Sequence, residues 1–459
     1  MRRSFRDPAG QLEDDGRQVR RIVHPAAREA TEVLLASPLY AELVRDGLLI
    51  PASQVAPSPD GGLLIEHPRI EIPSYPFEWT PAMLLDAALL TLDVQARAWV
   101  AGWTLKDAAA NNVLFDGTRP VLCDLLSLQK RTPDDTPGWL AYGQFVRHFV
   151  LPLLAIAEQG RTPRDIFLAH RDGLRAAELA PFIPWHSQFG LAMWLHVRLP
   201  ARLERRRIAS NTAKPGSGQP DARRPAADGT PWLIGNLRAF VQRLGRGGTA
   251  VSTWSAYTGN RDHYADAELN AKRGAVQALV DRLAPRRVLD IGANSGEFSL
   301  LAARAGAQVL ALDDDINALD ELHRGLRGQN TSIQCLHANF ARPTPATGWR
   351  LAETLSLPAR LEGRFDLVLM LAVIHHLAVT ERVPLVQLFE SLADCCSGML
   401  LLEFVPRDDP RFVEIAGANA ALYQDWSREN LLDAAAPWFG LQSETTISSH
   451  RTLLQLLRR

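Results

Sequence analysis

The feature that most constrains the fold is one run of the sequence, Val288-Leu-Asp-Ile-Gly-Ala-Asn-Ser-Gly-Glu-Phe-Ser299. Residues 287–291, with the apolar Val288, Leu289 and Ile291, predict a buried strand that has the acidic Asp290 near its end. Gly292 and Gly296 then flank a tight turn that opens a helix. Glycine lets the backbone approach a ligand closely, and the start of a helix offers free N–H groups. A strand, a glycine turn and a helix in this order predict a ligand site at the carboxyl end of a sheet.

Short apolar runs alternate with helical patterns through the rest of this half. Further strands are predicted over 308–312, 333–336, 365–371, 399–404 and 452–457, and helices over 297–304 and near 317–326. Strands separated by helices of this length predict an α/β fold with a doubly wound, mostly parallel sheet. The second strand runs into Asp313-Asp314-Asp315, where an acid can accept hydrogen bonds from both hydroxyls of a ribose.

With Asp290, Gly292, Asn294 and Gly296 in its first turn, the segment from about 254 to 459 resembles the class I S-adenosylmethionine (SAM)-dependent methyltransferases. In that family the turn follows an acid-x-Gly-x-Gly-x-Gly pattern, and Asn294 stands at the middle glycine. The resemblance implies a Rossmann-like domain that binds SAM. It also implies that Asp290 orients the methionine end and that Gly292 passes under the cofactor.

Three more cofactor positions come from the same resemblance. It implies that Asp313 holds the ribose, that Asn339 stands where the family has its adenine-binding acid, and that Leu371 ends the fourth strand beside the reactive methyl group. The main competitor is a dinucleotide-binding fold. It needs Gly-x-Gly-x-x-Gly, which the run at 288–299 fits poorly. We therefore expect SAM as the cofactor, and no metal.

Candidate catalytic groups follow the fourth and fifth strands. His375 and His376 come after an apolar run, and a histidine can take a proton from a substrate hydroxyl or ring N–H. The alternative is a histidine that caps the strand end. Glu403 ends the fifth strand and is predicted to be a second base or a substrate anchor, with a helix-capping or salt-bridged acid as the alternative. An Asn/Asp-Pro-Pro-Tyr motif is lacking here, which argues against methylation of an exocyclic amino group or a glutamine amide.

The first half of the chain carries a weaker pattern, in which Asp107 is followed by Asn112 and, after a predicted hairpin, by Asp124. This spacing resembles the catalytic and metal-binding loops of protein kinases and aminoglycoside phosphotransferases. Residues 1–105 contain no lysine, however, and the lysine that grips phosphate in an active kinase comes from that region. We therefore expect an α+β domain with a degenerate kinase-like scaffold for substrate or partner recognition. The alternative is that these three residues only cap turns.

One stretch, 205–229, is rich in Pro, Gly, Ala, Ser and charge, and it predicts a flexible linker. The chain of 459 residues then divides into an N-terminal domain over 1–204 and a methyltransferase domain over 230–459. Lys+Arg (50) and Asp+Glu (51) balance, so the basic surplus of a nucleic-acid-coating protein is missing. Four poorly spaced cysteines and the lack of a bilayer-length apolar run predict a cytoplasmic protein.

Two aromatic clusters, 74–79 and 139–145, extend the resemblance to long two-part methyltransferases related to rhizobial host-specificity nodulation proteins. This resemblance implies a bacterial enzyme that methylates a small molecule or a glycan. O-methylation is slightly preferred, because a neutral histidine suits a hydroxyl. The alternatives are an RNA or protein methyltransferase and an inactive SAM-binding regulatory protein. Neither a nucleic acid nor a membrane is expected as a partner.

Overall fold

The structure is a computed structural model, and it describes residues 2–4, 6–16, 18–132, 138–184, 190–210, 229–246, 266–329, 331–448 and 451–459. The chain divides into two compact units, Met1–Ala250 and Val251–Arg459. Each unit is described by itself. A search of the helices in the described part of the chain finds none that is both long and apolar enough to cross a bilayer.

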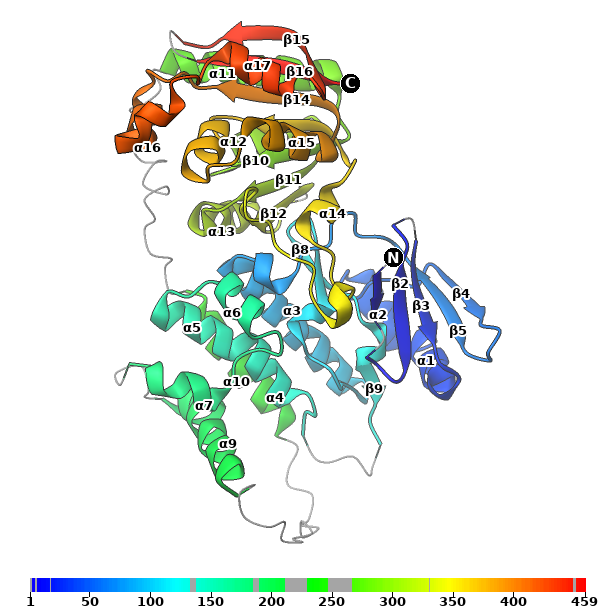
Figure 1. Cartoon of the computed structure of the whole chain (residues 1–459). Helices are drawn as coiled ribbons and strands as arrows, with labels where there is room; N and C mark the ends of the chain where they lie inside the picture. Colours follow the sequence, from blue (N-terminus) through cyan, green and yellow to red (C-terminus); the bar gives the residue numbers. More distant parts are fainter. Residues whose placement is uncertain are drawn as a thin grey trace. The chain divides into compact units, whose positions relative to one another are not determined.

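The N-terminal unit begins with an antiparallel sheet, drawn in blue in Figure 1. Within the described residues the strand order is β1-β2-β3-β5-β4. The bounds are β1 (Arg2–Ser4), β2 (Gly10–Asp14), β3 (Val19–Val23), β4 (Gln54–Pro57) and β5 (Leu63–His67). Val23 and Leu63 pair across β3 and β5, and with Ile65 they form a buried apolar face. Helices α1 (Arg28–Leu35) and α2 (Pro38–Arg45) connect β3 to β4.

Two short antiparallel pairs follow in the same unit. β6 (Trp103–Leu105) pairs with β9 (Leu128–Lys130), and β7 (Val113–Asp116) pairs with β8 (Arg119–Leu122). The β7–β8 pair confirms the predicted hairpin. At its open end the N–H of Cys123 donates to the carbonyl oxygen of Asn112 at 2.8 Å. This bond brings Asn112 and Asp124, which are distant in the predicted pattern, to neighbouring positions.

Helices make up the rest of the N-terminal unit. They are α3 (Pro81–Val100), α4 (Tyr142–Phe145), α5 (Leu151–Gln159), α6 (Pro163–Ala169), α7 (Ala176–Leu179), α8 (Leu191–Met193), α9 (Leu199–Ser210) and α10 (Thr230–Leu244). The long helix α3 begins at Thr80, whose side chain accepts the N–H of Met83. Its apolar residues are buried on most sides because α10, β6 and β8 all pack against it. It is therefore the central element of this unit.

The division between the units differs from the predicted domain boundary. We expected a linker over 205–229, but α9 continues to Ser210, and residues 211–228 lie outside the described residues. We also expected the second domain to begin at residue 230. Instead α10 packs against α3 and α5 of the first unit. The reason is its apolar stripe, in which Leu237 and Phe240 need a partner surface and find it in the first unit.

The C-terminal unit contains a mixed sheet. Within the described residues its strand order is β12-β11-β10-β13-β14-β16-β15. The bounds are β10 (Arg287–Ile291), β11 (Gln308–Asp313), β12 (Ile333–His337), β13 (Phe365–Met370), β14 (Cys396–Phe404), β15 (Phe439–Thr446) and β16 (Thr452–Arg458). The strands from β12 to β14 are parallel, and β16 and β15 add antiparallel pairs at one edge. The predicted α/β fold with a mostly parallel sheet is confirmed.

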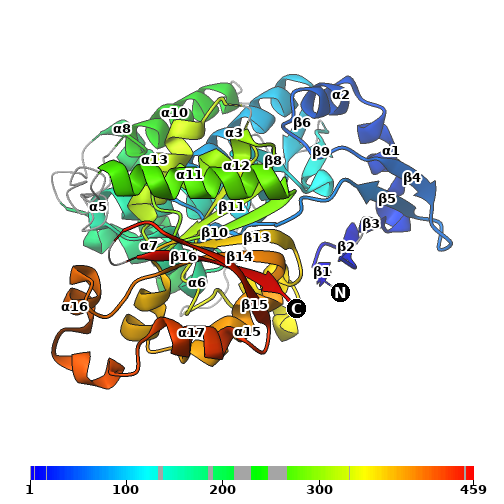
Figure 2. The ribbon, with the colours of Figure 1, turned by 90° about the horizontal axis from the view of Figure 1, so that it is seen from above.

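Helices cover both faces of this sheet. α11 (Asp266–Leu283), α12 (Glu297–Arg304) and α13 (Ile316–Leu326) lie on one face, and α15 (Leu385–Cys395) and α17 (Arg428–Ala435) lie on the other, as Figure 2 shows. The short α14 (Leu357–Leu361) packs against α15. Because both faces are covered, the central strands are continuous apolar runs, and Leu289, Val368 and Leu400 have no exposed surface.

Two short segments follow the carboxyl ends of neighbouring strands. A π-helical turn, η11 (His376–Thr380), follows β13, while α16 (Pro410–Ala416) and the 3-10 helix η12 (Gly417–Tyr423) follow β14. Val379 of the first segment packs with Val405 and Phe412 of the second in a small apolar cluster, against which Trp426 also packs. This cluster holds together the two segments that border the predicted site.

Candidate active site

The glycine turn leaves β10 and enters α12 beside the loop that follows β13. Gly292 and Gly296 both have φ of 77°, a left-handed conformation that strains other residues. A Cβ on Gly292 would lie 2.3 Å from Cγ2 of Val373, so a side chain does not fit there. Asn294 has φ of 47°, which asparagine tolerates better than most residues. The turn therefore needs these residue types at the positions that the sequence predicted.

Asp290 lies in β10 just before the turn, with only 2% of its surface exposed. Its Oδ2 accepts a hydrogen bond from the Ser299 hydroxyl at 2.6 Å. Burial raises the pKa of Asp290 to about 6, although the Ser299 hydrogen bond acts in the opposite direction. A buried carboxylate that is costly to ionise beside a glycine turn is more typical of a functional site than of a stabilising contact.

Asp313 ends β11 and reaches the same turn. Its Oδ2 accepts the N–H of Asn294 at 2.7 Å, and its Oδ1 accepts the N–H of Asp315 at 2.8 Å. Burial raises the pKa of Asp313, and these two hydrogen bonds oppose the shift. A carboxylate has about four lone-pair sites, so each oxygen can accept one more donor. Two neighbouring hydroxyls are a matching ligand, and the carboxylate thus fits the ribose of SAM.

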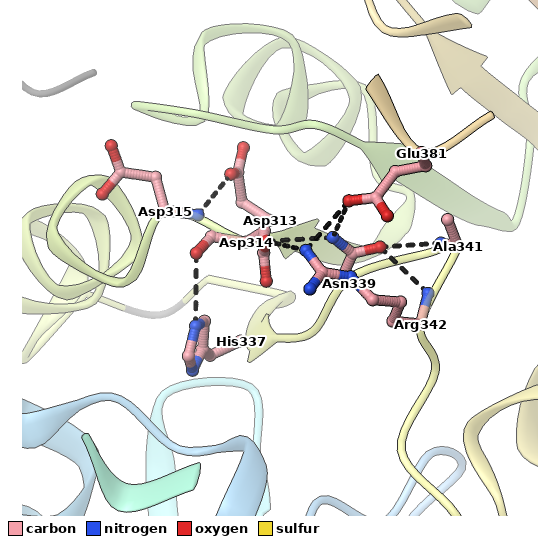
Figure 3. Close-up of polar contacts among 8 residues, drawn as sticks. All are labelled: Asp313, Asp314, Asp315, His337, Asn339, Ala341, Arg342 and Glu381. Atoms are coloured by element: carbon pink, nitrogen blue, oxygen red, sulfur yellow. Dashed lines mark hydrogen bonds and ion pairs between the residues drawn. The ribbon is translucent and has the colours of Figure 1, made fainter. Parts of the chain in front are cut away.

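Asn339 follows β12 and joins three loops at the sheet edge (Figure 3). Its Nδ2 donates to Asp314 Oδ2 at 2.9 Å and to Glu381 Oε1 at 3.2 Å. Its Oδ1 accepts the N–H groups of Ala341 at 2.8 Å and of Arg342 at 3.0 Å. Both the Nδ2 and the Oδ1 of Asn339 thus already have hydrogen-bond partners within the protein. Contact between Asn339 and adenine stays a prediction, and Asp314 and Glu381 are acidic neighbours that the sequence pattern did not indicate.

The predicted residues after β13 lie together at the end of that strand. Leu371 directly follows the strand and is buried. The rings of His375 and His376 are 4.4 Å apart, centroid to centroid. Within the described residues, Nδ1 of the buried His375 has no hydrogen-bond partner. His376 is half-buried, so of the two it is the one that a bound molecule can reach.

Both histidines are neutral near pH 7. Burial, with His376 and Arg451 as further causes, lowers the pKa of His375 to about 3. Burial and the nearby Arg411 also lower the pKa of His376. A neutral imidazole has one nitrogen that can accept a proton or a hydrogen bond. The pair is therefore in the protonation state that a proton acceptor needs.

Glu403 lies near the end of β14 with no exposed surface. Lys272 Nζ is 2.6 Å from its Oε2, and Arg451 Nη1 is 3.2 Å from its Oε1. Each carboxylate oxygen thus pairs with a cation, so it is poorly suited to take a proton from a substrate. The structure differs here from the prediction of a second base, and it has the salt-bridged acid that was the alternative. Neither Lys272 nor Arg451 stands in a motif, so no sequence pattern predicts this pairing.

A cleft of about 600 Å³ opens beside the end of β14. It is lined by Phe404, Pro406, Arg407, Asp408, Trp426, Ser427, Arg428 and Glu429. The volume lies within the range of sites for small ligands. Trp426 offers an aromatic surface, and its indole N–H donates to the Val405 carbonyl oxygen at 2.9 Å, which fixes the ring. The cleft combines aromatic and charged side chains at the edge where the predicted site residues gather.

In the N-terminal unit the structure gathers the predicted Asp107, Asn112 and Asp124 near Arg21 of β3. Arg21 Nη1 is 2.7 Å from Asp124 Oδ1, and Arg21 is buried. Asp107 Oδ1 accepts the N–H of Ala109 at 2.9 Å, and burial raises the pKa of Asp107. Nδ2 of Asn112 has no hydrogen-bond partner among the described residues. Nor does any group of three or more His, Cys, Asp or Glu side chains in the described part of the chain converge as metal ligands would.

Comparison with known proteins supports the reading of the C-terminal unit. Residues 262–447 match a protein-family model described as a methyltransferase domain. The chain is also 29% identical over 438 residues to the nodulation protein NoeA of Rhizobium meliloti (strain 1021). That match covers 94% of this chain and 90% of NoeA. The similarity to NoeA therefore includes both units.

Similar solved structures include two methyltransferases. Magnesium protoporphyrin IX methyltransferase (ChlM) from Synechocystis PCC 6803, with bound SAH, is 17% identical with a TM-score of 0.32. It covers 45% of this chain and 94% of its own. The N-methyltransferase NodS from Bradyrhizobium japonicum WM9 is 11% identical with a TM-score of 0.31. It covers 42% of this chain and 97% of its own.

The family match covers β10, the glycine turn and the strands that carry Asp290 and Asp313. In these elements Gly292 packs closely against Val373, and the carboxylate at the end of β11 accepts two backbone N–H groups. The C-terminal unit of this chain is a methyltransferase domain, and the protein is a SAM-dependent methyltransferase.

Proposed function

We propose that this enzyme transfers the methyl group of SAM to a hydroxyl of a small molecule or a glycan. The observation that carries the proposal is the neutral pair His375–His376 directly after β13. A hydroxyl loses its proton as it is methylated, and a neutral imidazole can accept that proton. The cleft of about 600 Å³ at the end of β14 supports an acceptor of small to moderate size.

On the cofactor side, we propose that the glycine turn from Gly292 to Gly296 passes under SAM and that Asp313 accepts the two ribose hydroxyls. Asp290 would orient the methionine end, Asn339 would lie near the adenine, and Leu371 would lie beside the methyl group. SAM itself supplies a methyl group that its sulfonium already activates, so the protein mainly has to align the acceptor with the methyl carbon.

On the acceptor side, we propose His376 as the proton acceptor. His375 is a weaker candidate for two reasons. It is 2% exposed, and its pKa of about 3 makes it a poor base near pH 7. His376 is half-buried and can meet the hydroxyl as the oxygen–carbon bond forms and the carbon–sulfur bond breaks. The proton then moves from the hydroxyl to an imidazole nitrogen of His376.

We further propose that the N-terminal unit is a kinase-like scaffold that binds a substrate or a partner without transferring phosphate. The support is the β7–β8 hairpin that carries Asn112 and Asp124, and the β6–β9 pair beside it. Arg21 occupies the one buried cationic position at Asp124 within the described residues, and no lysine precedes Lys106. Incubation with MgATP should give no phosphate release and no phosphorylated product, and transfer of the γ-phosphate would contradict the proposal.

The first test of the main proposal is calorimetry with SAM on the whole chain. We expect one SAM site, and we expect Asp290→Ala to abolish the binding. Labelling of a cell extract with SAM that carries an isotopic methyl group, followed by identification of the labelled class, then tests the acceptor. A labelled RNA or protein would contradict the proposed acceptor class, and no labelling with intact SAM binding would indicate a regulatory protein.

The second test separates the two histidines. His376→Ala should lower turnover by about 100-fold and change SAM affinity little, because general-base contributions are of that order. His375→Ala serves as the matched control, since its ring is buried. If His375→Ala lowers turnover as much as His376→Ala does, or if His376→Ala removes SAM affinity as well, His376 is a structural residue.

A further inference from the structure

One arginine holds both ends of a wall of the cleft. The wall segment, residues 404–408, supplies four of the residues that line the cleft. Glu403 precedes this segment and Asp409 follows it. Arg451 Nη1 donates to Glu403 Oε1 at 3.2 Å, while its Nε and Nη2 donate to Asp409 Oδ2 at 2.7 Å and Oδ1 at 3.3 Å. A single guanidinium thus ties the start of the segment to its end.

The tie is buried and lies in a longer chain of alternating charges. Glu403 is 0% exposed, Asp409 3% and Arg451 8%. Lys272 extends the chain from helix α11, with its Nζ 2.6 Å from Glu403 Oε2. Two cations thus face two carboxylates, so the charges of these four side chains cancel. A guanidinium is suited to this place because its planar fork can satisfy two carboxylates at once.

The row of charges also fixes a helix, at its Asp409 end. Asp409 caps α16, because its Oδ1 accepts the N–H of Arg411 at 2.8 Å. Burial, the largest single cause, would raise the pKa of Asp409, but the hydrogen bonds from Arg451 and from the Arg411 N–H, together with the charge of Arg451, outweigh it and lower the pKa. The carboxylate therefore stays charged and keeps its two partners. Through Phe412, α16 packs in the apolar cluster with Val405 of the wall segment and Val379 of η11.

A buried ion pair is weak evidence for stability, since apolar side chains of similar volume often do as well. What such a pair can supply is a defined arrangement of the elements it joins, and here those elements border the cleft. We propose that Arg451 is a positioning residue for the methyl acceptor: it fixes the wall segment 404–408 at both ends and thereby sets the shape of the acceptor cleft. This inference rests on the proposed function for the identity of the cleft.

The test compares the whole chain with three variants. Arg451→Met removes the tie, and Arg451→Lys keeps the charge but not the two-sided fork. Arg458→Met is the control, and Arg458 lies at the end of β16, the strand that begins directly after Arg451. Hydrogen exchange is measured for peptides that cover the wall segment, and SAM affinity is measured by calorimetry. We expect faster exchange in the wall segment of Arg451→Met, an intermediate effect for Arg451→Lys and none for Arg458→Met. SAM affinity should change by less than about twofold, because the hydrogen bonds of Arg451 described above go to Glu403 and Asp409 and not to the glycine turn.

Methyl transfer from labelled SAM to cell extract completes the test. Arg451→Met should lower the labelling rate by about 10-fold or more, because misplaced substrates react slowly. The proposal is overturned if exchange in the wall segment does not change, or if SAM affinity falls in proportion to the labelling rate. Asp409→Asn breaks the same tie from the other side and replaces Arg451→Met if that variant does not fold. Loss of SAM binding by the wild-type chain would instead refute the proposed function, since exchange needs no SAM.

Discussion

Each unit has a carboxylate at a strand, and the two carboxylates differ in whether a cation of the protein pairs with them. In the N-terminal unit Asp124, just after β8, pairs with the buried guanidinium of Arg21 at 2.7 Å. In the C-terminal unit Asp290 in β10 receives the Ser299 hydroxyl, and burial raises its pKa to about 6. The first carboxylate is neutralised by the protein itself. The second remains costly to ionise, which is the state expected of a group kept for a ligand.

This difference indicates that the C-terminal unit has the carboxylates that are available to a ligand. Asp313 follows the pattern of Asp290, because burial raises its pKa and only backbone N–H groups bind it in the described structure. Asp107 is the exception in the N-terminal unit, where burial also raises its pKa. The comparison thus predicts that changes at Asp124 mainly alter stability, whereas changes at the glycine turn and its carboxylates mainly alter SAM binding.

The largest effect is expected from Arg21→Met. It leaves Asp124 without its cation, and breaking a buried ion pair from one side costs about 3–5 kcal/mol. Urea denaturation should show this loss in the N-terminal unit, with unchanged SAM affinity. Arg119→Met is the control, because Arg119 forms an exposed pair with Asp116 on the neighbouring hairpin, worth at most about 1 kcal/mol. If Arg21→Met and Arg119→Met lost the same unfolding free energy, the pair at Asp124 would be no stronger than an exposed pair. The contrast between Asp124 and Asp290 would then be removed.

The next effect concerns the pH dependence of Asp290. Its pKa rises from the ordinary 3.8 to about 6 on folding, so the folded state binds the proton more tightly. Its contribution to stability is therefore fully present below about pH 4 and is lost as pH rises to about 6, by about 3 kcal/mol. Asp290→Asn removes this dependence. The difference in unfolding free energy between the variant and the wild type should change over that range, and a constant difference would contradict the raised pKa.

A smaller effect is expected from Gly292→Ala. The new Cβ would lie 2.3 Å from Val373 in a strained conformation, so the turn must shift, and SAM affinity should fall by about 10- to 100-fold. Gly306→Ala is the control, since Gly306 has φ of 94° but open space around its Cβ. Calorimetry should find normal SAM affinity in the control. Normal affinity in Gly292→Ala would mean that the close approach at the turn is not needed for the cofactor.

The smallest effect is expected from Arg342→Ala. The Arg342 side chain is 70% exposed, and it contacts Glu381 at 2.9 Å. An exposed ion pair of this kind contributes about 0–1 kcal/mol, so stability and SAM affinity should hardly change. A tenfold loss of SAM affinity would show that Arg342 takes part in the site. The group of acids and amides in Figure 3 would then act on the ligand rather than on the loops.

Much of the C-terminal unit could be predicted because its strands are buried on both faces and its turn has a motif. The predicted strands at 287–291 and 333–336 lie within one residue of β10 and β12. Strand β15 was missed because only Phe439 is buried in it and the rest is mostly exposed, which leaves no apolar pattern. The N-terminal sheet was missed for a similar reason, since its strands are short and rich in arginine and acids.

The candidate site likewise contains residues that a sequence motif predicts and residues that no motif predicts. Residues that belong to a motif, such as Gly292 and Asp313, were predicted because a local pattern carries their chemistry. The partners of Glu403 were not predicted, because Arg451 lies 48 residues away and Lys272 stands on a helix before the motif. Pairings between distant segments depend on the packed fold, and a single sequence does not show them.

The tie at Arg451 separates what is fixed in the cleft from what can vary. Between the two anchored carboxylates, Arg407 and Asp408 are exposed and line the cleft. Substitutions there need not disturb the frame, so relatives with the same anchors could exchange one acceptor for another through a few surface residues. For an engineer, Arg407 and Asp408 would be the positions to vary, whereas Val405 belongs to the buried apolar cluster and would be kept.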